Sequence, residues 1–99
     1  MTKNEMAAKL NDRQAWLPGK RIKFDFGDDG VVLIDGIAER VTEEDGAADT
    51  TIAISWDDLE ALRRRELDPM SALMQGRIRI DGDMANAMQL AGLTAKLQG

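Results

Sequence analysis

The sequence predicts an α+β fold in which helices cover one face of a five-stranded, mainly antiparallel sheet. Short segments of alternating apolar and charged residues, typical of strands with one solvated face, occupy much of the first half of the chain. Segments with the apolar spacing of helices stand at both ends and before the last strand. The 99 residues, 43% apolar and 31% charged, suit one domain, which we place at residues 1–99.

Five segments have the pattern of strands. In the first, Ile22, Phe24 and Phe26 alternate with charged residues. The dipeptide Asp35-Gly36 predicts a hairpin turn between the second and third segments. The first four segments follow one another through short connections, which predicts an antiparallel meander, and the fifth is expected at another edge. The five segments are 20–26, 31–34, 37–42, 50–55 and 77–81.

Helices are expected at 2–17, 55–65, 68–76 and from 84 onward. Ser55, Asp68 and Asp83 each precede a helical pattern and carry the side-chain oxygen of an N-cap. Asp68 is followed by Pro69, whose fixed φ suits the first position of a helix. Gly76 is expected in the left-handed position that ends the third helix.

The last helix has more apolar surface than one face of a sheet can cover. Its first stripe consists of Met84, Met88, Ala91 and Ala95, and its second of Leu90, Leu93 and Leu97. An ordinary surface helix has a single apolar stripe about 100° wide. Two interpretations follow: the helix is well buried in the core, or its second stripe lines a cavity for an apolar ligand, with methionines as adaptable walls.

The composition argues against an enzyme. Histidine and cysteine are absent, so the usual general base, the thiol nucleophile and most zinc ligands are missing. The acidic pairs Asp57-Asp58 and Asp81/Asp83 stand at helix starts, where capping accounts for them. The arginines at 63–65 are interpreted as closing a helix rather than binding phosphate, and the acidic segment 43–48 lacks calcium-loop spacing. We therefore expect no catalytic residues, no metal and no cofactor.

Charge and hydropathy indicate where the protein works. The net charge of −5 makes nucleic acid an improbable partner. Residues 1–23 carry six basic and two acidic residues, a segment that either forms a solvated helix face or touches an anionic membrane transiently. Without a signal peptide or an apolar run long enough to span a bilayer, a cytoplasmic location is expected.

An ordered set of motifs resembles the sterol carrier protein 2 family. The family pattern has a D-x-T-I strand, found here as Asp49-Thr50-Thr51-Ile52, and the longer segment LDPMSALMQGRIRIDGD at 67–83 followed by Ala87-Met88-Gln89-Leu90. The resemblance implies a lipid-binding domain with an apolar tunnel between a five-stranded sheet and its helices. The ending Leu97-Gln98-Gly99 lacks the peroxisomal S-K-L signal, which favours a bacterial-type member.

The expected ligand site has two sides. Its floor would consist of Ile22, Phe24, Phe26, Ile52 and Ile54, and its lid of Met70, Leu73, Met74, Met84, Met88 and Ala91. By the resemblance, Met70, Leu73, Met74 and Met88 occupy positions that face the family's tunnel. The function expected is a carrier of a fatty acyl, sterol-like or isoprenoid lipid. The alternatives are an accessory module whose apolar helix face binds a partner enzyme of lipid or quinone metabolism, and a closed, empty domain.

Overall fold

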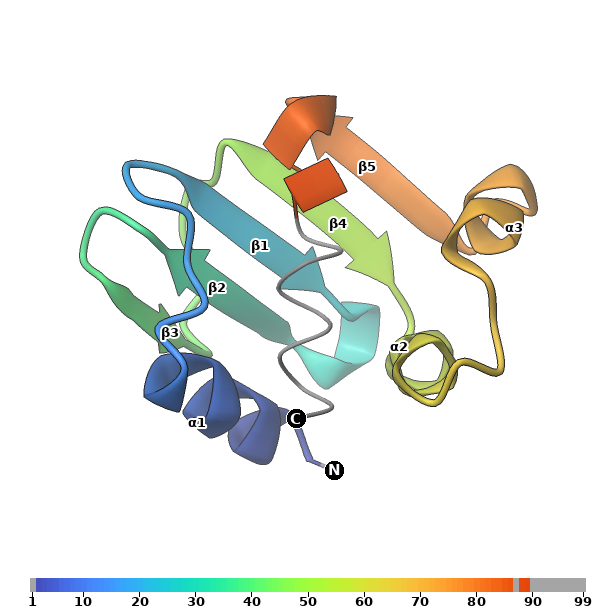
Figure 1. Ribbon diagram of the computed structural model, residues 1–99, viewed down its shortest axis with the longest axis horizontal. Coiled ribbons are helices and arrows are strands. Elements are labelled where there is room, and N and C mark those ends of the chain that lie inside the picture. The colour runs from blue at the N-terminus through green and yellow to red at the C-terminus, as the bar shows by residue number, and fades with distance from the viewer. Residues whose placement is uncertain (1, 87, 90–99) are drawn as a thin grey trace.

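The computed structural model describes residues 2–86, 88 and 89 (Figure 1). The helices are α1 (Lys3–Asp12), α2 (Trp56–Arg63) and α3 (Pro69–Met74), with a short 3-10 turn at Gly27–Asp29. The strands are β1 (Arg21–Asp25), β2 (Val31–Asp35), β3 (Arg40–Thr42), β4 (Thr50–Ile54) and β5 (Ile78–Gly82). A last helix begins at Met84 and includes residues 85, 86, 88 and 89. Within these residues no helix is long and apolar enough to cross a lipid bilayer.

The five strands form one sheet in the order β3-β2-β1-β4-β5. β1 with β2, β2 with β3, and β4 with β5 are antiparallel, whereas β1 and β4 are parallel. The prediction of a five-stranded, mainly antiparallel sheet is therefore confirmed. The predicted meander of four strands is wrong, because β4 crosses to the far side of β1 instead of pairing with β3 (Figure 1).

The third strand is shorter than predicted because Asp35 holds the turn before it. Its Oδ1 atom accepts hydrogen bonds from the backbone N–H groups of Ile37 (2.8 Å) and Ala38 (2.9 Å). The bond from the Ala38 N–H is the main cause of a lowered Asp35 pKa, with a further contribution from Arg21. Glu39 then has a left-handed φ of 56°, so regular pairing begins only at Arg40.

The first helix also ends earlier than predicted, at Asp12 rather than near residue 17. Gln14 has a left-handed φ of 51°, and the Ala15 N–H donates to the Leu10 carbonyl (2.9 Å). This is the geometry of a helix C-terminus that usually contains glycine, so its sequence signal is absent here. Within the helix, Met6, Ala7 and Leu10 are buried in the core.

The predicted helix caps are confirmed. The Ser55 Oγ accepts from the Asp58 N–H (3.1 Å), and the Asp68 carboxylate accepts from the Ser71 N–H (2.9 Å). The Asp83 carboxylate accepts from the Ala85 N–H (2.9 Å) at the start of the last helix. Gly76 has a φ of 75° just after α3, the left-handed conformation that ends a helix.

One face of the sheet, called the apolar face below, carries the core. Strand register brings its buried side chains into continuous rows, because residues paired across neighbouring strands point to the same face. In Figure 1 this face points toward the viewer, with α1 lying over it beside β3 and α2 at the end of β4. Buried side chains of the apolar face are Ile22, Phe24, Val32, Ile34, Val41, Ile52 and Ile54.

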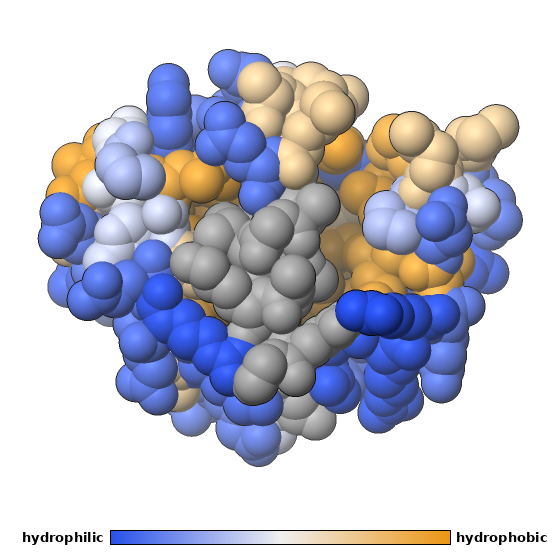
Figure 2. Space-filling model, in the orientation of Figure 1, coloured by the Kyte–Doolittle hydropathy of each residue, from blue (hydrophilic) through white to orange (hydrophobic). Residues whose placement is uncertain are grey.

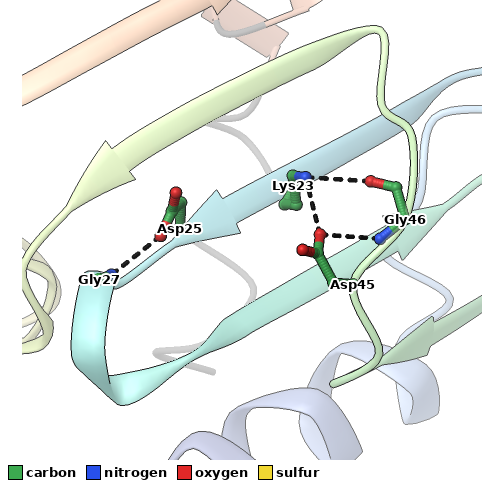
Figure 3. A network of polar contacts seen from close by, with 5 residues as sticks. All are labelled: Lys23, Asp25, Gly27, Asp45 and Gly46. Carbon is green, nitrogen blue, oxygen red and sulfur yellow. Dashed lines mark hydrogen bonds and ion pairs between the residues drawn. The ribbon is translucent and has the colours of Figure 1, made fainter.

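The opposite, polar face is crossed by the segment that connects β3 to β4. The Lys23 ammonium donates to the Asp45 carboxylate (2.8 Å) and to the Gly46 carbonyl (3.0 Å), as Figure 3 shows. Gly46 lies over the side chain of Leu33, which is buried on this face. The hydrogen bond from Lys23 lowers the pKa of Asp45, so the ion pair fastens the segment without offering a proton-transfer group near neutral pH.

Candidate functional site

The predicted floor forms as one apolar surface across the two central strands. Phe24 on β1 lies opposite Ile52 on β4, and Ile22 lies opposite Thr50. Ile22, Phe24, Phe26, Ile52 and Ile54 are each at most 5% exposed. Alternating positions on adjacent strands point to the same face, which is why the sequence pattern could place these residues together.

Aromatic contacts extend the floor from β1 to α2. The rings of Phe24 and Phe26 stack with centroids 5.8 Å apart. Phe26 meets Trp56, the first residue of α2, edge to face at 5.1 Å. Offset and edge-to-face aromatic pairs are favourable beyond the area that they bury. The end of the floor nearest α2 is therefore a fixed aromatic wall.

The lid residues that the structure describes are on the surface. Met70 is 65%, Leu73 36% and Met74 83% exposed on α3, where only Ala72 is buried. Met84 and Met88 of the last helix are 50% and 74% exposed. The sixth predicted lid residue, Ala91, lies outside the described residues. The structure thus brings the floor residues together but does not place the five described lid side chains against them.

The apolar surface around the floor is visible from outside. Figure 2 shows orange, apolar surface in a hollow on the side of α2 and α3, with paler apolar side chains at its upper rim. Figure 1 shows α3 beside the start of β5 rather than across the centre of the sheet. Exposed apolar side chains around an apolar hollow are a common feature of surfaces that bind lipids or proteins.

A polar connection missed by the sequence analysis attaches the last helix to the sheet. Thr50 is fully buried on the apolar face and Asn86 is 4% exposed. The Asn86 Nδ2 donates to the Thr50 Oγ1 (3.2 Å), and the Thr50 hydroxyl donates to the Asp83 carbonyl (2.8 Å). The sequence signal was the polar residue Asn86 near the start of a mostly apolar helix. Buried polar groups are costly unless paired, so this contact fixes where the helix begins.

The charged groups near α2 form internal ion pairs. Glu60 accepts from Arg63 at 3.0 Å and lies 3.5 Å from the Arg64 guanidinium. The hydrogen bond from Arg63 is the main cause of a lowered Glu60 pKa. This pairing agrees with the interpretation that the arginines close the helix. Among the described residues, no three acidic side chains are grouped so that they could hold a metal ion.

The sequence profile of the SCP-2 sterol transfer family matches residues 3–95. Human stomatin-like protein 1 is 41% identical over 54 residues, which are 54% of this chain and 14% of that protein. Rabbit sterol carrier protein 2 is 45% identical over 49 residues, 50% of this chain and 9% of that protein. The matched segments thus cover only a small part of these relatives.

Solved structures share the fold over nearly the whole chain. Sterol carrier protein 2 from Aedes aegypti in complex with palmitate superposes with a TM-score of 0.74 at 21% identity, and the match covers 94% of each chain. A ubiquinone synthesis protein, UbiJ-SCP2, superposes with a TM-score of 0.67 at 19% identity over 97% of this chain and 94% of the other. At these identities the likeness concerns the fold.

Proposed function

We propose that this chain, which belongs to the SCP-2 sterol transfer family, binds an apolar lipid on the apolar face of its sheet and carries it without chemical change. The observation that carries the proposal is the continuous apolar floor of Ile22, Phe24, Phe26, Ile52 and Ile54. A structure of the same fold holds palmitate. The lipid classes that suit such a surface are fatty acyl, sterol-like and isoprenoid.

In this proposal the lid residues close over the bound lipid. Met70, Leu73, Met74, Met84 and Met88 expose apolar surface to water. The sequence pattern adds Ala91, which lies outside the described residues. Covering a ligand would remove much of that surface from water. Burial contributes about 0.8 kcal/mol per methylene, so ten methylenes supply about 8 kcal/mol before the costs of ordering. Methionine side chains adapt to differently shaped ligands, which favours a broad range of lipids.

The experiment that tests the function is native mass spectrometry of the purified protein, followed by extraction and identification of any lipid. A stoichiometric additional mass that is extracted as one lipid class would establish the carrier and identify its cargo. A ligand-free mass that persists after incubation with fatty acids and quinones would contradict lipid binding.

Met88→Trp tests the position of the lid. The indole is too large for a lid that closes over an acyl chain, so uptake of a fluorescent fatty acid should fall by about tenfold or more. The matched control is Gln89→Trp, which adds the same ring at the next, polar position of the helix. Equal uptake by the two variants would place the lipid elsewhere; circular dichroism verifies that both remain folded.

The exposed lid also supports a second candidate function, an accessory module that binds a partner enzyme of lipid or quinone metabolism. Five exposed apolar side chains, on the elements that precede and follow β5, are the kind of surface that such an enzyme could cover. A neighbour in fold is described as a ubiquinone synthesis protein. Transfer of radiolabelled lipid between vesicles by the chain alone would favour the carrier. In either case we propose a cytoplasmic location, with transient contact of the basic N-terminal segment with an anionic membrane.

A further inference from the structure

The two edge strands of the sheet, β3 and β5, differ in what lies beside their outward backbone groups. At the β3 edge, the Asn11 side chain donates to the Val41 carbonyl (2.7 Å) and accepts from the Val41 N–H (2.6 Å). Asn11 therefore bonds to the edge backbone as a neighbouring strand would. At the other edge, no described strand lies beyond β5 (Figure 1). An uncovered edge strand offers its backbone to another strand.

Hydrogen bonds at the ends of the strands show which β5 residues face outward. The Asp83 N–H donates to the Asp49 carbonyl (3.4 Å), which makes Asp49 and Asp83 a hydrogen-bonded pair in the register of β4 and β5. Hydrogen-bonded and non-hydrogen-bonded pairs alternate along an antiparallel ladder, so the odd-numbered residues of β5 bond to β4. The hydrogen bonds between β1 and β2 are consistent with this alternation. The Gly36 N–H donates to the Lys20 carbonyl and the Phe26 N–H to the Gly30 carbonyl, so the even-numbered residues of β1 bond to β2 and its odd-numbered residues face β4. Ile78, Ile80 and Gly82 thus direct their N–H and C=O groups away from the sheet.

We propose that β5 pairs antiparallel with β5 of a second copy, centred on Ile80, and joins two sheets into one of ten strands about a two-fold axis. In this register Ile80 meets its own copy in a hydrogen-bonded pair, and Ile78 lies opposite Gly82 of the second copy. The apolar face then continues across the seam, because Ile78 and Ile80 belong to the rows of Ile54 and Ile52.

Charges on the polar side select this register. Arg79 stands opposite Asp81 of the second copy, and Asp81 opposite its Arg79, in the closer, non-hydrogen-bonded positions of the ladder. Just beyond the strand, Arg77 stands opposite Asp83 of the second copy. If the two-fold axis lay at residue 79 instead of Ile80, Arg79 would face Arg79 of the second copy. If it lay at residue 81, Asp81 would face Asp81. One alignment therefore matches every charge, and its neighbours oppose like charges.

The exposed apolar residues enlarge the contact. A five-residue strand pair buries less area than a stable interface needs, so further surface must contribute. Met70, Leu73 and Met74 lie before β5 in the chain, and Met84 and Met88 lie after it. Antiparallel pairing brings α3 of one copy to the end of the strand at which the last helix of the second copy begins. All five side chains are exposed in the single chain.

Charge reversal tests the pairing. Sedimentation equilibrium of the lipid-free protein should give twice the chain mass of 10.9 kDa. Arg79→Asp and Asp81→Arg each create two like-charge pairs across the seam and should raise the dimer Kd by about tenfold or more. Mixed in equal amounts, the two variants match every charge again and should form a heterodimer. Arg40→Asp, at the β3 edge, is the matched control and should leave the mass unchanged.

Three results would overturn the proposal: a wild-type monomer at high concentration, unchanged dimers in both variants, or a mixture that stays monomeric. Hydrogen exchange keeps the test independent of how the variants fold. In the wild type, the Ile80 amide should be protected at concentrations where the dimer forms and exchange freely after dilution. An Ile80 amide with the same exchange rate at both concentrations would contradict the pairing, whatever the variants do.

Discussion

At the scale of single residues, close approach of two backbone segments restricts Gly36. Its N–H donates to the Lys20 carbonyl (2.7 Å) and its carbonyl accepts from the Gly19 N–H (3.2 Å). A Cβ atom at Gly36 would overlap the Leu17 carbonyl oxygen. The position therefore tolerates no side chain unless the turn moves and these hydrogen bonds are lost.

We predict that Gly36→Ala lowers the free energy of unfolding by about 2–4 kcal/mol, because relief of the overlap must displace backbone. The control is Gly46→Ala, whose Cβ would lie 3.4 Å from a Leu33 methyl group, an ordinary contact, and which should change stability by less than about 1 kcal/mol. Urea unfolding of the two variants measures both values. Equal losses would show that the turn at Gly36 adapts.

The floor residues could be predicted from sequence, whereas the polar residues beside them could not. Phe24, Ile52 and Ile54 stand at alternating positions, and alternation directly determines which side chains share a face. Asn86 and Thr50 are far apart in the chain, and neither segment indicates that the other contains its hydrogen-bond partner. Their hydrogen bond depends on how the last helix begins over β4, which no local pattern records.

At the scale of elements, the helix starts have the clearest sequence signals. Ser55, Asp68 and Asp83 each satisfy an N–H group that the helix itself leaves unpaired. The cap at Ser55 also determines that α2 begins at Trp56, whose ring contacts Phe26. The start of the helix is thereby linked to the aromatic end of the floor.

Ser55→Ala should therefore cost about 1 kcal/mol of stability through loss of the bond to the Asp58 N–H. Ser55→Asp, which retains an acceptor oxygen at the same position, should stay close to the wild type. Chemical denaturation at neutral pH compares the two. If the alanine and aspartate variants were equally stable, the cap would contribute nothing measurable.

Strand existence could be predicted, but strand order could not. The segment from 43 to 49 gives no sign that it spans two strands on the polar face, and the contacts that hold it there join Lys23 to Asp45 and Leu33 to Gly46. Likewise, the Asp35 carboxylate accepts hydrogen bonds from the N–H groups of Ile37 and Ala38, which lengthens the turn. Strand β3 therefore begins later than the dipeptide Asp35-Gly36 suggests. These interactions form only when distant segments meet.

At the scale of the whole molecule, the proposed carrier function predicts that the stability of the protein depends on the bound lipid. A ligand that binds only the folded state stabilises it by an amount set by concentration and affinity. Palmitate at a hundred times its Kd should therefore raise the free energy of unfolding by about 2.7 kcal/mol.

Scanning calorimetry with and without palmitate measures this gain, and Met88→Trp should show little of it. If saturating palmitate left the unfolding temperature of the wild type unchanged, the protein would not be a fatty acyl carrier. The accessory module predicts that outcome, so this measurement separates the two proposed functions.

The parallel contact between β1 and β4 has a consequence for how the chain folds. β1 is the middle strand, and its antiparallel partner β2 follows it closely in sequence, so α1 and the first three strands can assemble early. Its other partner begins only at Thr50 and requires closure of a long loop, which is the slower kind of step. During synthesis on the ribosome, the middle strand therefore keeps one edge unpaired until β4 arrives, and β4 in turn provides the edge on which β5 pairs.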